Sequence, residues 1–60
     1  MTTIPAGRQQ YILSLIRREG TVTVSRLAQD LEVSELTIRR DLDQMAARSL
    51  VERTHGGATE

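Results

Sequence analysis

Arg39 and Arg40 stand side by side in the segment VSELTIRRDL, residues 33–42, where they are well suited to bind a negative partner. A guanidinium group is planar and can donate two parallel hydrogen bonds to a phosphate or to O6 and N7 of guanine. The alternative is a solvated helix face, because Glu35 precedes Arg39 at a spacing that makes an ion pair worth about 0.2–0.5 kcal/mol. Arg40 has no acid at that spacing before it, although Asp43 follows it closely.

A helix must carry these side chains, and the apolar pattern after Ser34 predicts one that ends near Arg48. Ser34 is the expected N-cap. The inward stripe, recognised by its helical spacing, consists of Ile38, Leu42 and Met45. The opposite side, with its two flanks, offers Leu36, Arg40, Thr37 and Arg39.

The first half of this outward face suits the major groove of DNA, which admits a helix and is read from the helix N-terminus. The two arginines can contact guanine or phosphate, and an exposed Leu36 can touch a thymine methyl group. Thr37 can bind a phosphate or a methyl group, and Ser34 with the N–H groups of the first turn can bind a phosphate. Asp41 lies at the edge of the buried stripe, so we expect it to hold a nearby arginine instead of DNA.

Two more helices are predicted upstream, over residues 4–20 and 24–31, because apolar residues recur there at helical spacing. Between them TVTV, residues 21–24, is β-branched throughout and can begin a short strand. Thr23 is the expected N-cap of the second helix. Only about four residues separate that helix from the one after Ser34, and such a tight turn predicts a helix-turn-helix arrangement.

Beyond the third helix, Leu50, Glu52 and Thr54 alternate with Val51 and Arg53, which predicts a strand. Gly56 and Gly57 then predict a turn. Only three residues follow Gly57. We therefore expect the returning strand of the hairpin to be cut short, and the chain to be a domain excised from a longer protein.

Composition restricts the classes of function. A chain of 60 residues is a single domain, and it buries only about 60% of the surface of its unfolded form, which favours a binding module over an enzyme cleft. The chain has no cysteine and a single histidine, His55, so we expect no disulfide, no metal, no cofactor and no catalysis. A net charge of zero argues mildly against non-specific binding to polyanions. No signal peptide or membrane span is evident, so we expect a cytoplasmic protein.

Two motifs at the expected separation carry a family resemblance: VS-x-x-TIRRDL in residues 33–42 and R-x-HGGA in residues 53–58. Together with TVTVSRLAQDLEV before them, they resemble the DeoR-type winged helix-turn-helix domain. The resemblance covers residues 4–59, with a helix-turn-helix segment at 21–40 and a wing at 50–59. It implies a mainly helical fold with a small β wing, in the DNA-binding domain of bacterial regulators of sugar metabolism, mostly repressors.

The resemblance also implies that the wing turn meets the DNA backbone or minor groove. Its glycines let the main chain approach phosphates, whereas a lone histidine is as often an ordinary surface residue. Arg53 on the adjoining strand either contacts DNA or pairs internally. The candidate DNA-binding residues are Thr23, Ser34, Leu36, Thr37, Arg39, Arg40, His55, Gly56 and Gly57.

Two positions depart from the expected pattern, because Glu32 and Ser49 stand where related domains favour glycine. If residue 32 needs a left-handed backbone, glutamate costs roughly 1–2 kcal/mol there, and Glu32→Gly should raise the melting temperature.

For the parent protein, the resemblance implies a further C-terminal domain that binds a phosphorylated sugar and sets the oligomeric state, with regulation by occluding RNA polymerase. The rival interpretation is a winged helix that binds proteins without DNA.

Overall fold

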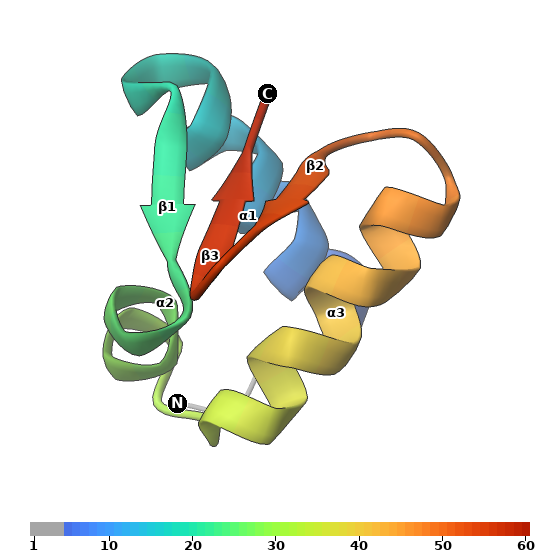
Figure 1. Cartoon of the computed structure of the whole chain (residues 1–60). Coiled ribbons are helices and arrows are strands. Elements are labelled where there is room, and N and C mark those ends of the chain that lie inside the picture. Colours follow the sequence, from blue (N-terminus) through green and yellow to red (C-terminus); the bar gives the residue numbers. More distant parts are fainter. Residues whose placement is uncertain (1–4) are drawn as a thin grey trace.

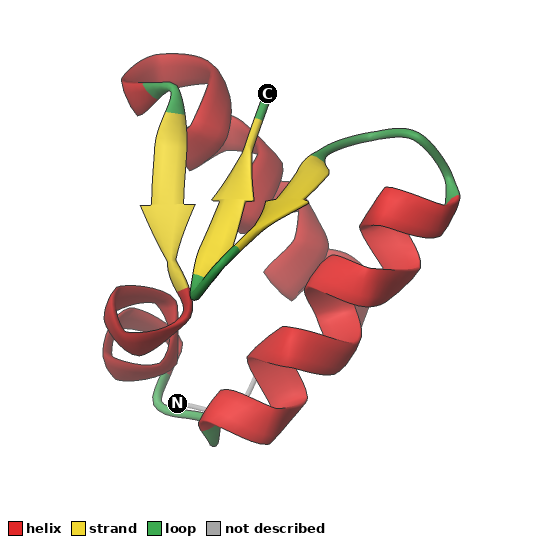
Figure 2. Cartoon of the chain, viewed as in Figure 1, coloured by secondary structure: helices red, strands yellow, loops and turns green. Residues whose placement is uncertain are grey.

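The computed structural model describes residues 5–60, which form three helices and one antiparallel sheet (Figure 1, Figure 2). In chain order the elements are α1 (Pro5–Glu19), β1 (Thr21–Thr23), α2 (Val24–Leu31), α3 (Glu35–Ala47), β2 (Glu52–Thr54) and β3 (Gly57–Thr59). This order confirms the predicted winged helix-turn-helix with a small β wing. Residue 4, where we expected the first helix to begin, lies outside the described residues.

One apolar core holds the helices and the sheet together. Its buried side chains are Ile12, Leu15, Ile16, Val22, Val24, Leu27, Leu31, Ile38, Leu42, Met45, Val51 and Ala58. Every helix contributes the stripe that its apolar spacing predicted. Each fully buried Val, Leu, Ile or Met side chain favours folding by about 1.5–3 kcal/mol, so the three stripes fix how the helices pack.

The returning strand of the wing, which we expected to be cut short, is present. β3 is the central strand of a sheet with the order β1-β3-β2, and it pairs antiparallel with both neighbours. Its middle residue, Ala58, pairs with Val22 on one side and Arg53 on the other, and it is fully buried. Three residues are enough to form this strand because β3 is paired along both edges. The sequence predicted only a two-stranded hairpin, which would pair β3 along one edge.

Within residues 5–60, two residues other than glycine adopt a left-handed backbone, and they are the two departures noted in the sequence. Glu32 has a φ of 57° and ends α2, where its N–H donates to the carbonyl of Gln29 at 3.3 Å. Ser49 has a φ of 61° just after α3, and its N–H donates to the carbonyl of Ala46 at 2.9 Å. Residue 32 therefore has the left-handed backbone that was considered for it. Both turns lose some stability because a residue with a side chain is strained in this conformation.

Candidate nucleic-acid interface

The first turn of α3 is capped by hydroxyl groups. Ser34 has an extended backbone, and its Oγ accepts a hydrogen bond from the Thr37 N–H at 3.1 Å. The Ser34 Oγ also lies 3.0 Å from the Thr37 Oγ1. The prediction that Ser34 is the N-cap of α3 is thus confirmed, and the cap fixes the direction in which α3 leaves the turn.

The outward face of the first half of α3 carries an apolar side chain and two arginines that differ in their partners. Leu36 is 55% exposed. The Arg39 Nη2 donates to the Glu35 Oε1 at 3.3 Å, as the spacing predicted. Arg40 is exposed, and its side chain makes no ion pair or hydrogen bond to any part of residues 5–60. Arg40 is therefore available to a ligand, whereas Arg39 must first break its weak ion pair with Glu35.

A buried ion pair anchors the opposite side of α3. Asp41 is only 3% exposed, and its carboxylate accepts from the Arg8 Nε at 2.6 Å and Nη2 at 3.2 Å. The hydrogen bond to this carboxylate is the main cause that raises the pKa of Arg8 above its ordinary value. The prediction that Asp41 holds an arginine is confirmed. No local pattern indicated its partner, which lies 33 residues away in α1.

The wing turn lies against the start of α2. The Val24 N–H donates to the Gly56 carbonyl at 2.9 Å. Thr23 caps α2 as predicted, since its Oγ1 accepts from the Arg26 N–H at 3.1 Å. Gly56, with a φ of +87°, and His55 are both exposed in the turn. Thr23 and the wing turn therefore meet at one end of the sheet, an arrangement that the sequence did not specify.

Gly57 is the exception among the candidate residues, because it is buried. A Cβ atom at this position would lie 2.0 Å from the Val22 carbonyl oxygen and 3.1 Å from the Thr23 Cα. Glycine is therefore needed here so that β3 can approach β1, whereas His55 and Gly56 are the exposed residues of the turn.

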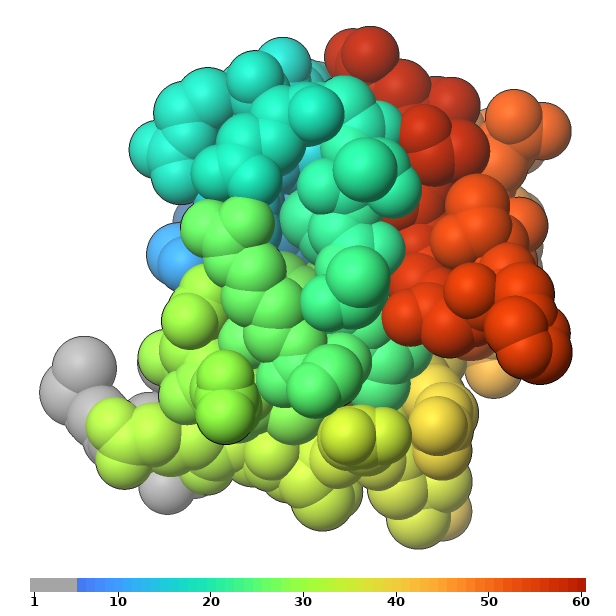
Figure 3. All heavy atoms as spheres, turned by 60° about the vertical axis from the view of Figure 1, so that its left-hand side comes forward, coloured from blue at the N-terminus to red at the C-terminus, as the bar shows by residue number. Residues whose placement is uncertain are grey.

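Arg53 pairs internally, which is one of the two alternatives that its position left open. Its Nε donates to the Gly57 carbonyl at 3.0 Å, and its Nη1 pairs with the Asp43 carboxylate on α3. The side chain is 29% exposed. Arg53 thus links the wing to the outward-facing helix. In Figure 3 the wing turn, in orange-red, lies along the same side of the molecule as the yellow part of α3.

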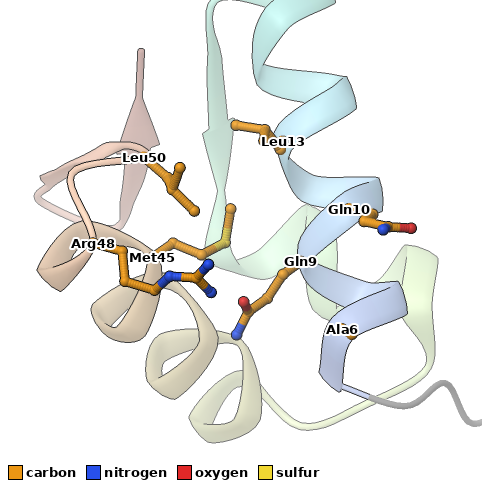
Figure 4. Close-up of a pocket in the computed structure, with 7 residues that line it drawn as sticks. All are labelled: Ala6, Gln9, Gln10, Leu13, Met45, Arg48 and Leu50. Atoms are coloured by element: carbon orange, nitrogen blue, oxygen red, sulfur yellow. The ribbon is translucent and has the colours of Figure 1, made fainter.

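A shallow hollow lies away from this face, between α1, the end of α3 and the segment before β2 (Figure 4). It is lined by Ala6, Gln9, Gln10, Leu13, Met45, Arg48 and Leu50. Within residues 5–60, no cluster of His, Cys, Asp or Glu could hold a metal ion. No helix in the same range is long and apolar enough to span a membrane.

Two helices joined by a tight turn, with an exposed arginine in the first half of the second helix, are the architecture by which helix-turn-helix domains meet DNA. The sequence matches the DeoR-like helix-turn-helix domain over residues 8–60. The chain belongs to this family. It is a helix-turn-helix DNA-binding domain.

Several curated relatives of this DeoR-like domain are transcription regulators. It is 43% identical over 51 residues to the lactose phosphotransferase system repressor of Lactococcus lactis. Over 51 residues it is also 45% identical to the L-fucose operon activator of Haemophilus influenzae and 41% identical to the glycerol-3-phosphate regulon repressor of Escherichia coli. Each alignment covers 85% of this chain and 20% of the relative. The chain therefore matches about a fifth of the length of these regulators. No solved structure matches it significantly.

Proposed function

We propose that this domain recognises a specific duplex sequence by placing α3 in the major groove, with Arg40 donating to guanine O6 and N7. The observation that supports this most directly is the state of Arg40, exposed and without a partner in residues 5–60, next to a Leu36 that is 55% exposed. An arginine in this state has no internal bond to break before it binds. Leu36 then contacts a neighbouring thymine methyl group.

Apart from the buried Gly57, the remaining candidate residues contact the DNA backbone or the adjacent groove in this proposal. Arg39 exchanges its exposed pair with Glu35 for a phosphate, because a phosphate accepts two hydrogen bonds from the same guanidinium. Ser34, Thr37 and the first N–H groups of α3 approach another phosphate. At the other end of the interface, Thr23 is placed to contact the backbone, and His55 and Gly56 carry the wing turn to the adjacent groove.

For a longer parent protein, we propose transcriptional regulation of sugar-metabolism genes in the bacterial cytoplasm, at the nucleoid. The support is the naming of relatives for lactose, fucose and glycerol-3-phosphate systems. In a repressor, a bound domain would occlude RNA polymerase, and a phosphorylated sugar bound elsewhere in the protein would control it. A homo-oligomer would gain affinity by pairing two half-sites.

A selection from a random pool of double-stranded DNA tests the proposal. We expect a recurring motif to be enriched, and its affinity to fall steeply with salt because phosphate contacts release counterions. A winged helix that binds proteins alone would enrich no motif, and its apolar contacts would respond little to salt. A selection that enriched no sequence motif would overturn the proposal.

A further inference from the structure

We propose that Arg53 keeps Arg40 available to DNA by holding the Asp43 carboxylate away from it. This inference deepens the function proposed above, since it concerns the arginine that reads the base. Arg53 would then be a positioning residue that acts on recognition through α3 without touching the DNA.

The helix itself offers Arg40 several possible partners. On a helix surface, side chains three and four residues apart are neighbours, so Arg40 adjoins Leu36, Thr37, Asp43 and Gln44. The Leu36 side chain has no polar atom. Each of the other three carries an oxygen that can accept a hydrogen bond from a guanidinium.

The two neutral acceptors are occupied elsewhere. The Thr37 Oγ1 lies 3.0 Å from the Ser34 Oγ. The Gln44 Oε1 accepts from the Gln9 Nε2 of α1 at 3.0 Å. Both oxygens are neutral, so each would hold a guanidinium less strongly than a carboxylate would.

Asp43 is the decisive neighbour, because it is the charged one. It pairs with the Arg53 Nη1, and Arg53 is fixed in turn by the hydrogen bond from its Nε to the Gly57 carbonyl at 3.0 Å. The Asp43 side chain is 67% exposed, so its direction is not set by packing. The wing therefore determines which arginine Asp43 meets.

Removing Arg53 should let Asp43 turn to Arg40, whose position three residues earlier suits a helical ion pair. DNA would then have to break that pair, which costs about two- to threefold in affinity at low salt for an exposed pair. The cost should shrink as salt screens the pair.

The test is a set of double-mutant cycles built on Arg53→Gln, which removes the charge but keeps an amide that can donate to the Gly57 carbonyl. Affinity for the strongest duplex recovered by the selection is measured by fluorescence anisotropy at low salt. We expect Arg53→Gln to weaken wild-type binding about two- to threefold. It should have almost no effect in an Asp43→Asn background, or in an Arg40→Ala background.

Simple loss of positive charge predicts a different result, namely the same fold-change from Arg53→Gln in all three backgrounds. That result would overturn the proposal, because it is also what a direct DNA contact by Arg53 or a loosened wing would give. Arg17→Gln, an exposed arginine in the last turn of α1, controls for one lost charge. Melting temperatures of all variants check that each remains folded at the assay temperature.

A measurement without DNA separates this inference from the function on which it rests. In the free protein, the NMR signal of the Arg40 Nε–H should shift on Arg53→Gln and return when Asp43→Asn is added. An unchanged signal would overturn the inference even if the domain binds its duplex as proposed. A shifted signal with no enriched duplex would support the contact and reject the DNA-binding role.

Discussion

The outward face of α3 and the wing each carry an arginine, but their polar groups are used differently. In the wing, the Gly56 carbonyl is bonded to the Val24 N–H, and the Gly57 carbonyl accepts from the Arg53 Nε. On α3, Leu36 is 55% exposed and Arg40 has no polar partner among the described residues. Groups with internal bonds stabilise the domain, while groups without them remain for a ligand.

This difference distinguishes two arginines. Arg40 lies on α3 and Arg53 lies on β2, and Arg53 has two internal partners, the Gly57 carbonyl and the Asp43 carboxylate on α3. Changes in the wing should therefore alter folding first, and changes on the outward face of α3 should alter binding first.

The largest effect is expected from Gly57→Ala. The new Cβ would meet the Val22 carbonyl oxygen at 2.0 Å, and a backbone clash cannot be relieved by a side-chain rotation. We expect a loss of about 3 kcal/mol or more in the free energy of unfolding, which is most of the roughly 3–5 kcal/mol available to a domain of this size.

Urea unfolding followed by circular dichroism measures this loss. Gly56→Ala is the matched control, because nothing lies within 4 Å of its added Cβ and only the φ of +87° opposes it. That strain costs about 1–2 kcal/mol. Equal stability of the two variants would show that β3 does not need the close approach to β1.

Changes on the inward side of α3 should, like changes in the wing, reduce the free energy of unfolding. Arg8→Met leaves the Asp41 carboxylate, 3% exposed, without the guanidinium that it binds. We expect a loss of about 3 kcal/mol, because an uncompensated buried charge is costly. Thermal unfolding should show that adding Asp41→Leu recovers most of the loss. A double variant no more stable than the single one would mean that packing, and not charge, is the cause.

Arg40→Ala should weaken DNA binding and leave stability almost unchanged. It should weaken binding to the selected duplex by about 1–3 kcal/mol and relax preference at one base pair, while the free energy of unfolding changes by less than about 0.5 kcal/mol. Anisotropy against a panel of single-base variants of the duplex measures both properties.

Arg18→Ala is the control for Arg40→Ala, since Arg18 lies in the last turn of α1 and pairs there with Glu19. It should change binding little. If Arg40→Ala weakened every duplex in the panel equally, Arg40 would be a phosphate contact that does not read a base.

Substitutions at the two left-handed turns should have effects between these extremes. Glycine relieves the strain at Ser49, whose φ is 61°, and at Glu32, whose φ is 57°. After the greater freedom of glycine in the unfolded chain is subtracted, each change should add about 1 kcal/mol, or about 4–8 °C in melting temperature. Scanning calorimetry checks this, and a lower melting temperature would mean that the lost side chain contributes more than the strain.

The smallest effect should come from an exposed pair outside both regions. The Glu19 carboxylate accepts a hydrogen bond from the Arg26 Nη1 at 2.6 Å, and this bond is the main cause that lowers the Glu19 pKa from its ordinary 4.5. When the pKa of a carboxyl group is lower in the folded state than in the unfolded state, the charged group stabilises the fold at pH values above its ordinary pKa. This contribution is lost as the pH falls through the pKa of the folded state. Melting temperatures of wild type and Glu19→Gln should therefore converge as the pH falls below 4.5. A constant difference down to pH 3 would rule out this linkage.

Much of this domain followed from local sequence. Apolar spacing gave the inward stripes of three helices, and the caps at Thr23 and Ser34 were evident because a cap bonds to the backbone only a few residues away. The outward face of α3 followed from the same periodicity. The left-handed turns were indicated only through the family pattern, since nothing local marks glutamate or serine for that conformation.

Tertiary structure decided what depends on residues far apart in the chain. The sheet has three strands because β1, which precedes α2, pairs with β3. The partner of Asp41 is Arg8, which lies in α1. Local spacing determined which side chains face outward, because a helix repeats every few residues. Tertiary structure decided that Asp43 pairs with Arg53, because partners distant in the sequence are set by where the chain returns in space.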